Sequence, residues 1–164
     1  MIELKPIVQK AIPRALEKAE RYRLLNEPAE AESICRDVLQ IDPENQKALI
    51  MLLLALTDQF DGRVTLDHAR ELLASLRDEY EKAYYAGIIY ERWAKAQLER
   101  GEPGSGSLAY DWFCEAMSCY EKAESTRPLE NDDAILRWNT CARFLMKNPH
   151  LAPGLEERSL DLLE

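Results

Sequence analysis

The chain of 164 residues carries a formal net charge of −9. A chain of this length forms a domain of ordinary size, and its acidic balance repels duplex nucleic acid and anionic membrane surfaces, so we expect neither as a partner. The longest apolar run, residues 48–56, is far shorter than the roughly 20 residues that cross a bilayer. Charges at Glu3, Lys5 and Lys10 interrupt the apolar segment that a signal peptide requires, so we expect a cytoplasmic protein.

The composition predicts an all-α fold. Apolar residues make up 46% of the chain and charged residues 31%, with only 6 Gly and 8 Pro, and the commonest residues are good helix formers. The four cysteines lie in apolar helical patterns in a chain without an export signal, so we expect buried, reduced thiols at Cys35, Cys114, Cys119 and Cys141.

The first helical pattern begins at Pro13, a residue suited to the first turn of a helix, and its apolar side carries Ala15, Ala19 and Tyr22. A break at residues 26–28 separates it from a second helix, which ends at residues 41–43 because a proline disfavours helix at the residue before it. The apolar face of this second helix consists of Ala31, Ile34, Cys35, Val38 and Leu39. The two segments predict a helical hairpin.

This hairpin resembles the tetratricopeptide repeat, whose pattern is W-x2-L-G-x2-Y, then A-x3-F, then P. The matching residues are Ala19-x2-Tyr22, Ala31-x3-Cys35 and Pro43, whereas Ala15 and Lys18 stand at the Trp and Leu positions. The resemblance covers about residues 12–147 and implies a right-handed superhelical stack of antiparallel helix hairpins.

The chain also repeats itself. Glu30-Ala31-x-Ser33 and Glu115-Ala116-x-Ser118 are each followed by a proline at the same offset, and Asn-x-x-Ala comes shortly after each proline, at Asn45 and at Asn131. Small residues at Ala31 and Ala116 would allow two helices to approach closely, and the prolines would end those helices.

These patterns divide a single domain, residues 1–164, into approximate repeats 12–45, 46–80 and 81–130, a capping helix 131–147 and a tail 148–164. The expected helices after the first hairpin span residues 46–60, 65–80, 81–100, 108–126 and 132–147, and glycines predict a flexible loop over residues 101–107. Three alternatives stay open for the tail: it completes the last hairpin, it docks in an apolar groove, or it is disordered.

No motif predicts a catalytic residue, a metal site or a cofactor. The glycine-rich loop lacks the Lys and hydroxyl residues of a phosphate-binding loop, and Cys114 and Cys119, five residues apart, point in different directions on a helix. Two alternatives stay open: a cysteine-dependent enzyme that uses Cys141 or Cys114, and an aromatic cage built from Trp93, Trp112 and Trp138, whose helical spacing otherwise indicates packing.

The run at residues 49–56 is apolar on every face, and such a helix must be covered on every face. The tetratricopeptide resemblance implies that Ile50, Met51 and Leu54 line the inner groove of the stack together with the first helix. Either they form an apolar binding surface, or another part of the chain covers them. The candidate partner-binding residues are therefore Leu16, Glu20, Ile50, Met51 and Leu54. They lack the Lys, Asn and Arg clamp with which some members of the family hold chaperone tails.

The resemblance implies an adaptor or scaffold without enzymatic activity, which binds a peptide or helix of another protein as a monomer or weak homodimer. The alternative within the family is a small secretion-type chaperone or co-chaperone.

Overall fold

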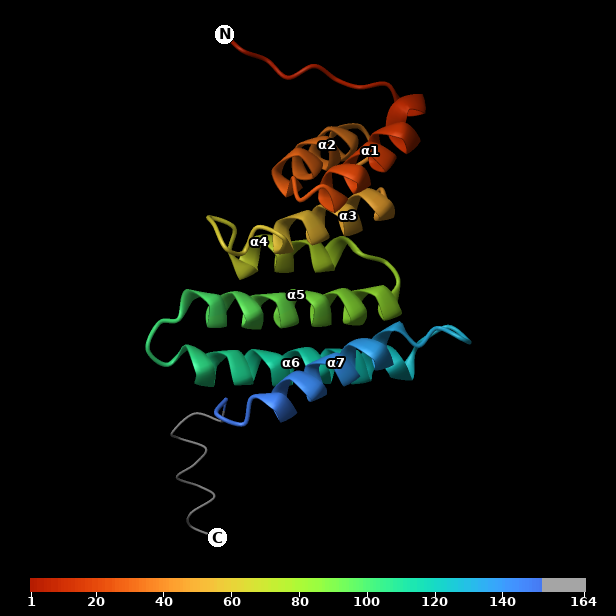
Figure 1. Ribbon diagram of the computed structural model, residues 1–164. Coiled ribbons are helices and arrows are strands. Elements are labelled where there is room, and N and C mark those ends of the chain that lie inside the picture. The colour runs from red at the N-terminus through yellow and green to blue at the C-terminus, as the bar shows by residue number, and fades with distance from the viewer. Residues whose placement is uncertain (152–164) are drawn as a thin grey trace. The chain divides into compact units, whose positions relative to one another are not determined.

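The computed structural model describes residues 1–151, and within this range every regular element is a helix (Figure 1). The all-α prediction is therefore confirmed. The α-helices are α1 (Ile12–Leu24), α2 (Pro28–Ile41), α3 (Gln46–Thr57), α4 (Leu66–Arg70), α5 (Glu79–Arg100), α6 (Ser105–Ser125) and α7 (Asp133–Lys147); 3-10 helices span Gln9–Ala11 and Glu71–Ser75.

The chain forms two compact units, an N-terminal unit of Met1–Arg77 and a C-terminal unit of Asp78–Glu164. The alternatives for the tail concern residues 152–164, which lie outside the described part of the chain. Residues 148–151 of the expected tail are described, and Leu151 is buried there, with its Cδ2 atom close to Gly106.

In the N-terminal unit, α1 packs against α2, and α3 packs against both of them. Pro13 is the second residue of α1, and Asn26, with φ of +60°, turns the chain into α2. The α2 helix ends at Ile41, as the sequence predicts, and Asn45 then caps α3 by accepting a hydrogen bond from the Ala48 amide at 3.0 Å. The first hairpin is thus formed by the residues whose spacing predicts it.

The second helix of the middle repeat differs from the prediction. The sequence predicts one continuous helix over residues 65–80. In the structure the short helix α4 is followed directly by a 3-10 helix, which ends at Ser75. Leu76 is extended, with ψ of 139°, and is only 1% exposed. Asp78 then caps α5 by accepting from the Glu81 amide at 3.1 Å. Burial of Leu76 and the Asp78 cap favour a break in the helix here, although the apolar residues of the sequence keep their helical spacing through this segment.

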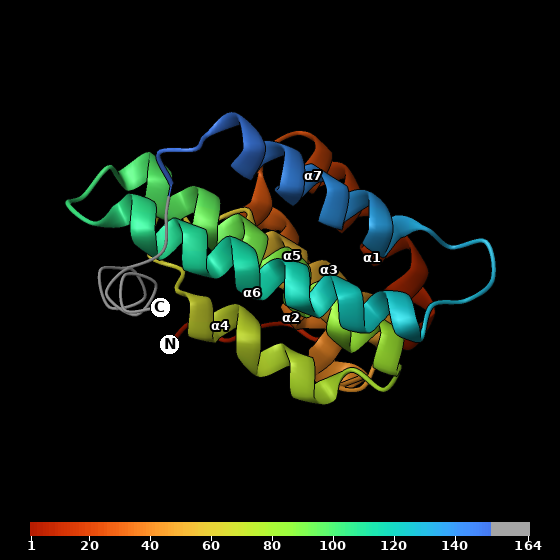
Figure 2. The same ribbon diagram turned by 90° about the horizontal axis from the view of Figure 1, so that it is seen from below.

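In the C-terminal unit, α5 and α6 form a long hairpin whose helices lie side by side, and α7 packs on α6 (Figure 2). Gly101 ends α5 in the left-handed conformation, with φ of +64°. The α6 helix begins at Ser105, so the prediction of a loop over residues 101–107 is wrong for its last three residues. Gly106 lies inside the helix, against Leu151.

Residues at equivalent positions of the two repeated segments have the same burial. Ala31 of α2 and Ala116 of α6 are fully buried, and so are the residues four positions later, Cys35 and Tyr120. The alanines of the two Asn-x-x-Ala segments, Ala48 and Ala134, are fully buried as well. The repeated sequence therefore corresponds to repeated packing positions.

Candidate functional site

A cavity of about 430 Å³ lies on the N-terminal unit between α1 and α3. Four of the five candidate partner-binding residues line it: Leu16 and Glu20 from α1, and Ile50 and Met51 from α3. The other lining residues are Pro13, Glu17 and Lys47. Leu54, half-buried one turn beyond Ile50 on α3, does not line the cavity.

Helical spacing explains why these residues share one cavity. Residues three and four apart lie on the same face of a helix, and the lining residues of α1 are at positions 13, 16, 17 and 20, whereas those of α3 are at positions 47, 50 and 51. The packing of α1 against α3 brings the two faces together. Segments about 30 residues apart in the chain therefore build one surface.

Apolar and charged side chains both line the cavity. Leu16, Ile50 and Met51 are half-buried, so part of each side chain is accessible from solvent. Glu17 and Glu20 are exposed on the α1 side, and Lys47 is exposed on the α3 side. The volume falls within the range of small binding pockets, and the arrangement suits an apolar side chain whose neighbours carry charges.

A second arrangement, which the sequence pattern does not reveal, is a buried carboxylate in the C-terminal unit. Glu91 of α5 is 1% exposed. It accepts hydrogen bonds from the Tyr120 hydroxyl at 3.0 Å, the Lys95 ammonium at 2.7 Å, the Cys141 thiol at 3.4 Å and the Arg137 guanidinium. Because Tyr120 belongs to α6 and Arg137 and Cys141 belong to α7, this one carboxylate connects three helices.

Electrostatics keep Glu91 ionised. Burial alone would raise the pKa of the carboxyl, but the hydrogen bonds and charges of Lys95 and Arg137 outweigh burial and hold its pKa below the usual value. The same carboxylate adds to the effect of burial on the pKa of Tyr120, which is raised. Glu91, Tyr120 and Cys141 are buried, whereas Lys95 and Arg137 reach Glu91 from partly exposed positions. We interpret these groups as a structural network. The only local sign in the sequence is Lys95, one helical turn after Glu91.

The cysteines differ in burial, so the expectation of four buried thiols is wrong for two of them. Cys35 and Cys141 are buried, whereas Cys114 is exposed and Cys119 is half-buried. Burial raises the pKa of Cys35 to about 12, and burial together with Glu91 raises that of Cys141 to about 12. A catalytic thiol requires the opposite shift, so Cys141 is a protonated core thiol at neutral pH.

The three tryptophans have separate neighbours. Trp112 stacks on Tyr90 with ring centroids 5.4 Å apart, Trp93 lies 5.4 Å from the Arg100 guanidinium, and the Trp138 ring nitrogen donates to Glu121 at 3.1 Å. These are contacts of packing side chains and give no support to a shared aromatic cage.

Residues 1–151 contain no cluster of three His, Cys, Asp or Glu side chains that could hold a metal ion. His68 instead accepts a hydrogen bond from the Thr65 amide at 3.0 Å and thereby caps α4. None of the helices in this range has the length and apolar character needed to cross a membrane.

A scan against protein-family models finds no matching family, and searches of curated proteins and of solved structures find no match either. The function must therefore be inferred from the geometry of the chain itself.

Proposed function

We propose that the chain is a cytoplasmic adaptor of the tetratricopeptide type, which binds a peptide or helix of another protein in the groove between α1 and α3. One observation carries the proposal: Leu16, Glu20, Ile50 and Met51 come from two helices and line a single cavity. Apolar grooves between helices commonly receive the apolar face of a partner helix. The groove would bury apolar side chains of the partner and would catalyse no reaction of the partner.

Two sequence features support the tetratricopeptide interpretation. The first hairpin carries the Ala-x3-apolar spacing and the closing Pro43, and the equivalent alanines Ala31 and Ala116 are both fully buried. We infer that the hairpins belong to a right-handed superhelical stack. In such a stack the first helix of each pair lines the concave face, which is where a partner would bind.

The charges around the groove define the partner further. Glu17 and Glu20 favour a basic residue on the side of the ligand that faces α1, and Lys47 favours an acidic residue on the side that faces α3. We therefore expect an amphipathic peptide with one or two large apolar residues, a Lys or Arg on one flank and an Asp or Glu on the other.

Selection from a library of displayed amphipathic peptides tests the proposal. The selected peptides should bind the purified chain, and Ile50→Glu should lower their affinity at least about tenfold, because an apolar anchor in such a pocket contributes more than about 1.4 kcal/mol. Leu136→Glu, a matched change at an exposed leucine of α7, should leave the affinity unchanged. Unfolding midpoints of both variants, measured by circular dichroism, verify that they are folded.

The charge pattern gives an independent readout. The double change Glu17→Lys with Glu20→Lys should shift the selected peptides from basic to acidic residues on the α1 flank. If the peptides bind the Ile50→Glu variant as tightly as the parent chain, the groove between α1 and α3 is not the binding site.

A further inference from the structure

The first eight residues form an arm without helix or turn (Figure 1). Apart from Ile7, which is half-buried, its apolar residues are exposed. Ile2 is 99% exposed, Leu4 91% and Val8 70%. With Pro6, these residues occupy every second position, and alternate residues of an extended chain lie on one face. The arm therefore presents an apolar stripe at the spacing of a β-strand, and clustered exposed apolar residues indicate an interaction surface.

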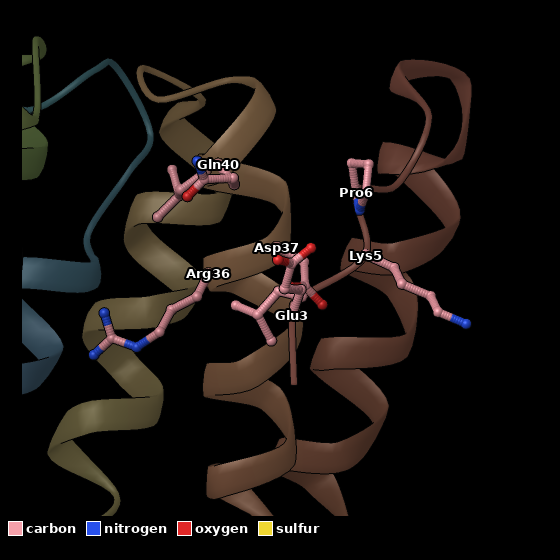
Figure 3. Close-up of a pocket in the computed structure, with 8 residues that line it drawn as sticks. Glu3, Lys5, Pro6, Arg36, Asp37 and Gln40 are labelled. Atoms are coloured by element: carbon pink, nitrogen blue, oxygen red, sulfur yellow. The ribbon is translucent and has the colours of Figure 1, made fainter. Parts of the chain in front are cut away.

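The arm is anchored to the core at Ile7, and a cavity separates its preceding residues from α2. Ile7 packs against the core cluster of Ile12, Val38 and Ala48. A cavity of about 810 Å³ lies between the arm and α2, and Leu4, Pro6 and Leu39 are its apolar lining residues. Figure 3 shows that Lys5 extends away from the α2 side chains Arg36 and Asp37.

Apart from one carbonyl, the polar groups of the arm have no partners among residues 1–151. Neither Glu3 nor Lys5 makes an ion pair there, and the one backbone hydrogen bond of the arm runs from the Ala11 amide to the Val8 carbonyl. The amides and carbonyls of residues 2–5 thus resemble those of an unpaired edge strand, which can pair with another extended segment.

We propose that the arm pairs with the same arm of a second copy of this chain, in an antiparallel ribbon centred on Leu4, and that the second arm fills the cavity beside α2. In this alignment Leu4 faces Leu4 of the other copy, and Ile2 faces Pro6. Glu3 faces Lys5 at two symmetric places, which is a favourable cross-strand charge pair. A parallel alignment would instead place like charges opposite each other.

Pro6 fits the same alignment. Residue pairs of an antiparallel ribbon alternate between hydrogen-bonded and non-hydrogen-bonded. If the central Leu4 pair is non-hydrogen-bonded, the pairs of Glu3 with Lys5 exchange both backbone hydrogen bonds, and Pro6 falls at a non-hydrogen-bonded position. The missing amide of proline is tolerated there. A two-stranded ribbon alone is marginal in water, so the packing of the second arm on Leu39 and Leu4 supplies the rest, and the dimer is weak.

Charge exchange between copies tests this pairing. Sedimentation equilibrium of the full chain up to near-millimolar concentration should show a reversible dimer. Glu3→Lys and Lys5→Glu should each weaken dimerisation at least about tenfold, because each places like charges opposite one another twice. An equimolar mixture of the two variants should form a heterodimer at least about as readily as the parent forms its homodimer, because every facing pair is again of opposite charge.

The matched control is Glu27→Lys, which makes the same charge change at an exposed residue outside the arm and should leave dimerisation nearly unchanged. The proposal is overturned if the parent chain stays monomeric over this concentration range. It is also overturned if the dimer persists equally in both single variants, or if mixing them does not restore it.

Discussion

The ring of Tyr120 on α6 packs directly against the backbone of Gly87 on α5. A Cβ atom at position 87 would lie 2.6 Å from Cδ1 and 2.8 Å from Cζ of this ring, closer than carbon atoms approach in folded proteins. The ring cannot move away easily, because Tyr120 is fully buried and its hydroxyl donates to Glu91. Gly87 is therefore the point that permits the close approach of the two long helices.

Gly87→Ala should lower the free energy of unfolding by about 1–3 kcal/mol through overpacking. A change from Gly to Ala inside a helix usually has the opposite effect and raises the free energy of unfolding by about 0.5–1 kcal/mol. Gly62→Ala is the control, since its added Cβ would meet only the Gln59 carbonyl oxygen at 3.6 Å. Urea denaturation of both variants gives the comparison, and an alanine at position 87 that stabilises the protein would contradict the packing described.

Ala31→Leu and Ala116→Leu should each destabilise the chain by about 1–3 kcal/mol, because both alanines are fully buried where helices pack closely. Ala29→Leu places the same side chain on an exposed position of α2 and should change stability by less than about 0.5 kcal/mol. Chemical denaturation of the three variants is the measurement. Equal stabilities of Ala29→Leu and Ala31→Leu would show that Ala31 does not occupy a tight site.

Arg137→Met should cost about 1–3 kcal/mol of stability, because it removes the guanidinium partner of the buried Glu91 carboxylate, whereas the Lys95 ammonium remains as a charged partner. The double change Glu91→Met with Arg137→Met should recover much of this loss, since it removes the buried charge as well. Thermal or urea unfolding of the single and double variants measures the coupling. A double variant that is less stable than Arg137→Met alone would mean that Glu91 stabilises the core without this ion pair.

The stability of the C-terminal unit should fall in acid through Glu91. Burial opposes its charge, but Lys95 and Arg137 hold the pKa of the folded carboxyl below the usual value. The unfolded chain therefore binds this proton at a higher pH than the folded chain does. The stabilisation that ionised Glu91 gives to the folded state is complete above about pH 4.3–4.5, and it is lost as the pH falls through the pKa of the folded state. Unfolding free energies from pH 7 to pH 3 should fall less steeply in Glu91→Gln than in the parent. Parallel curves would refute the assignment.

Thiol alkylation at neutral pH should separate the cysteines by burial. Cys114 is exposed and should react fastest, whereas Cys35 and Cys141, whose pKa values are raised to about 12, should react only when the chain opens. Mass spectrometry of labelled peptides over time, with and without urea, measures each rate. Rapid labelling of Cys141 in the folded protein would reopen the interpretation of this thiol as a nucleophile.

The sequence by itself determined the local structure of this protein. Pro28, the apolar face of Ala31, Cys35 and Val38, and the break before Pro43 specify α2 at the bounds that the structure has, because caps, prolines and helical spacing act within a few residues. The same spacing, combined with the tetratricopeptide resemblance, predicted that Leu16, Glu20, Ile50 and Met51 would lie together. Leu54 lies one turn farther along α3 and does not line this cavity, whose extent depends on where the neighbouring helix lies.

Only the tertiary structure decided the features that depend on contacts between distant segments. Helical periodicity continues through residues 65–80, yet burial of Leu76 ends the helix there. Glu91 is an ordinary surface residue by its local pattern, and it is buried because Tyr120 and Arg137, which lie 29 and 46 positions away, satisfy its charge. The exposure of Cys114 likewise reflects which face of α6 the other helices cover. Such choices depend on the free energy of packing across the whole unit, which no short stretch of sequence contains.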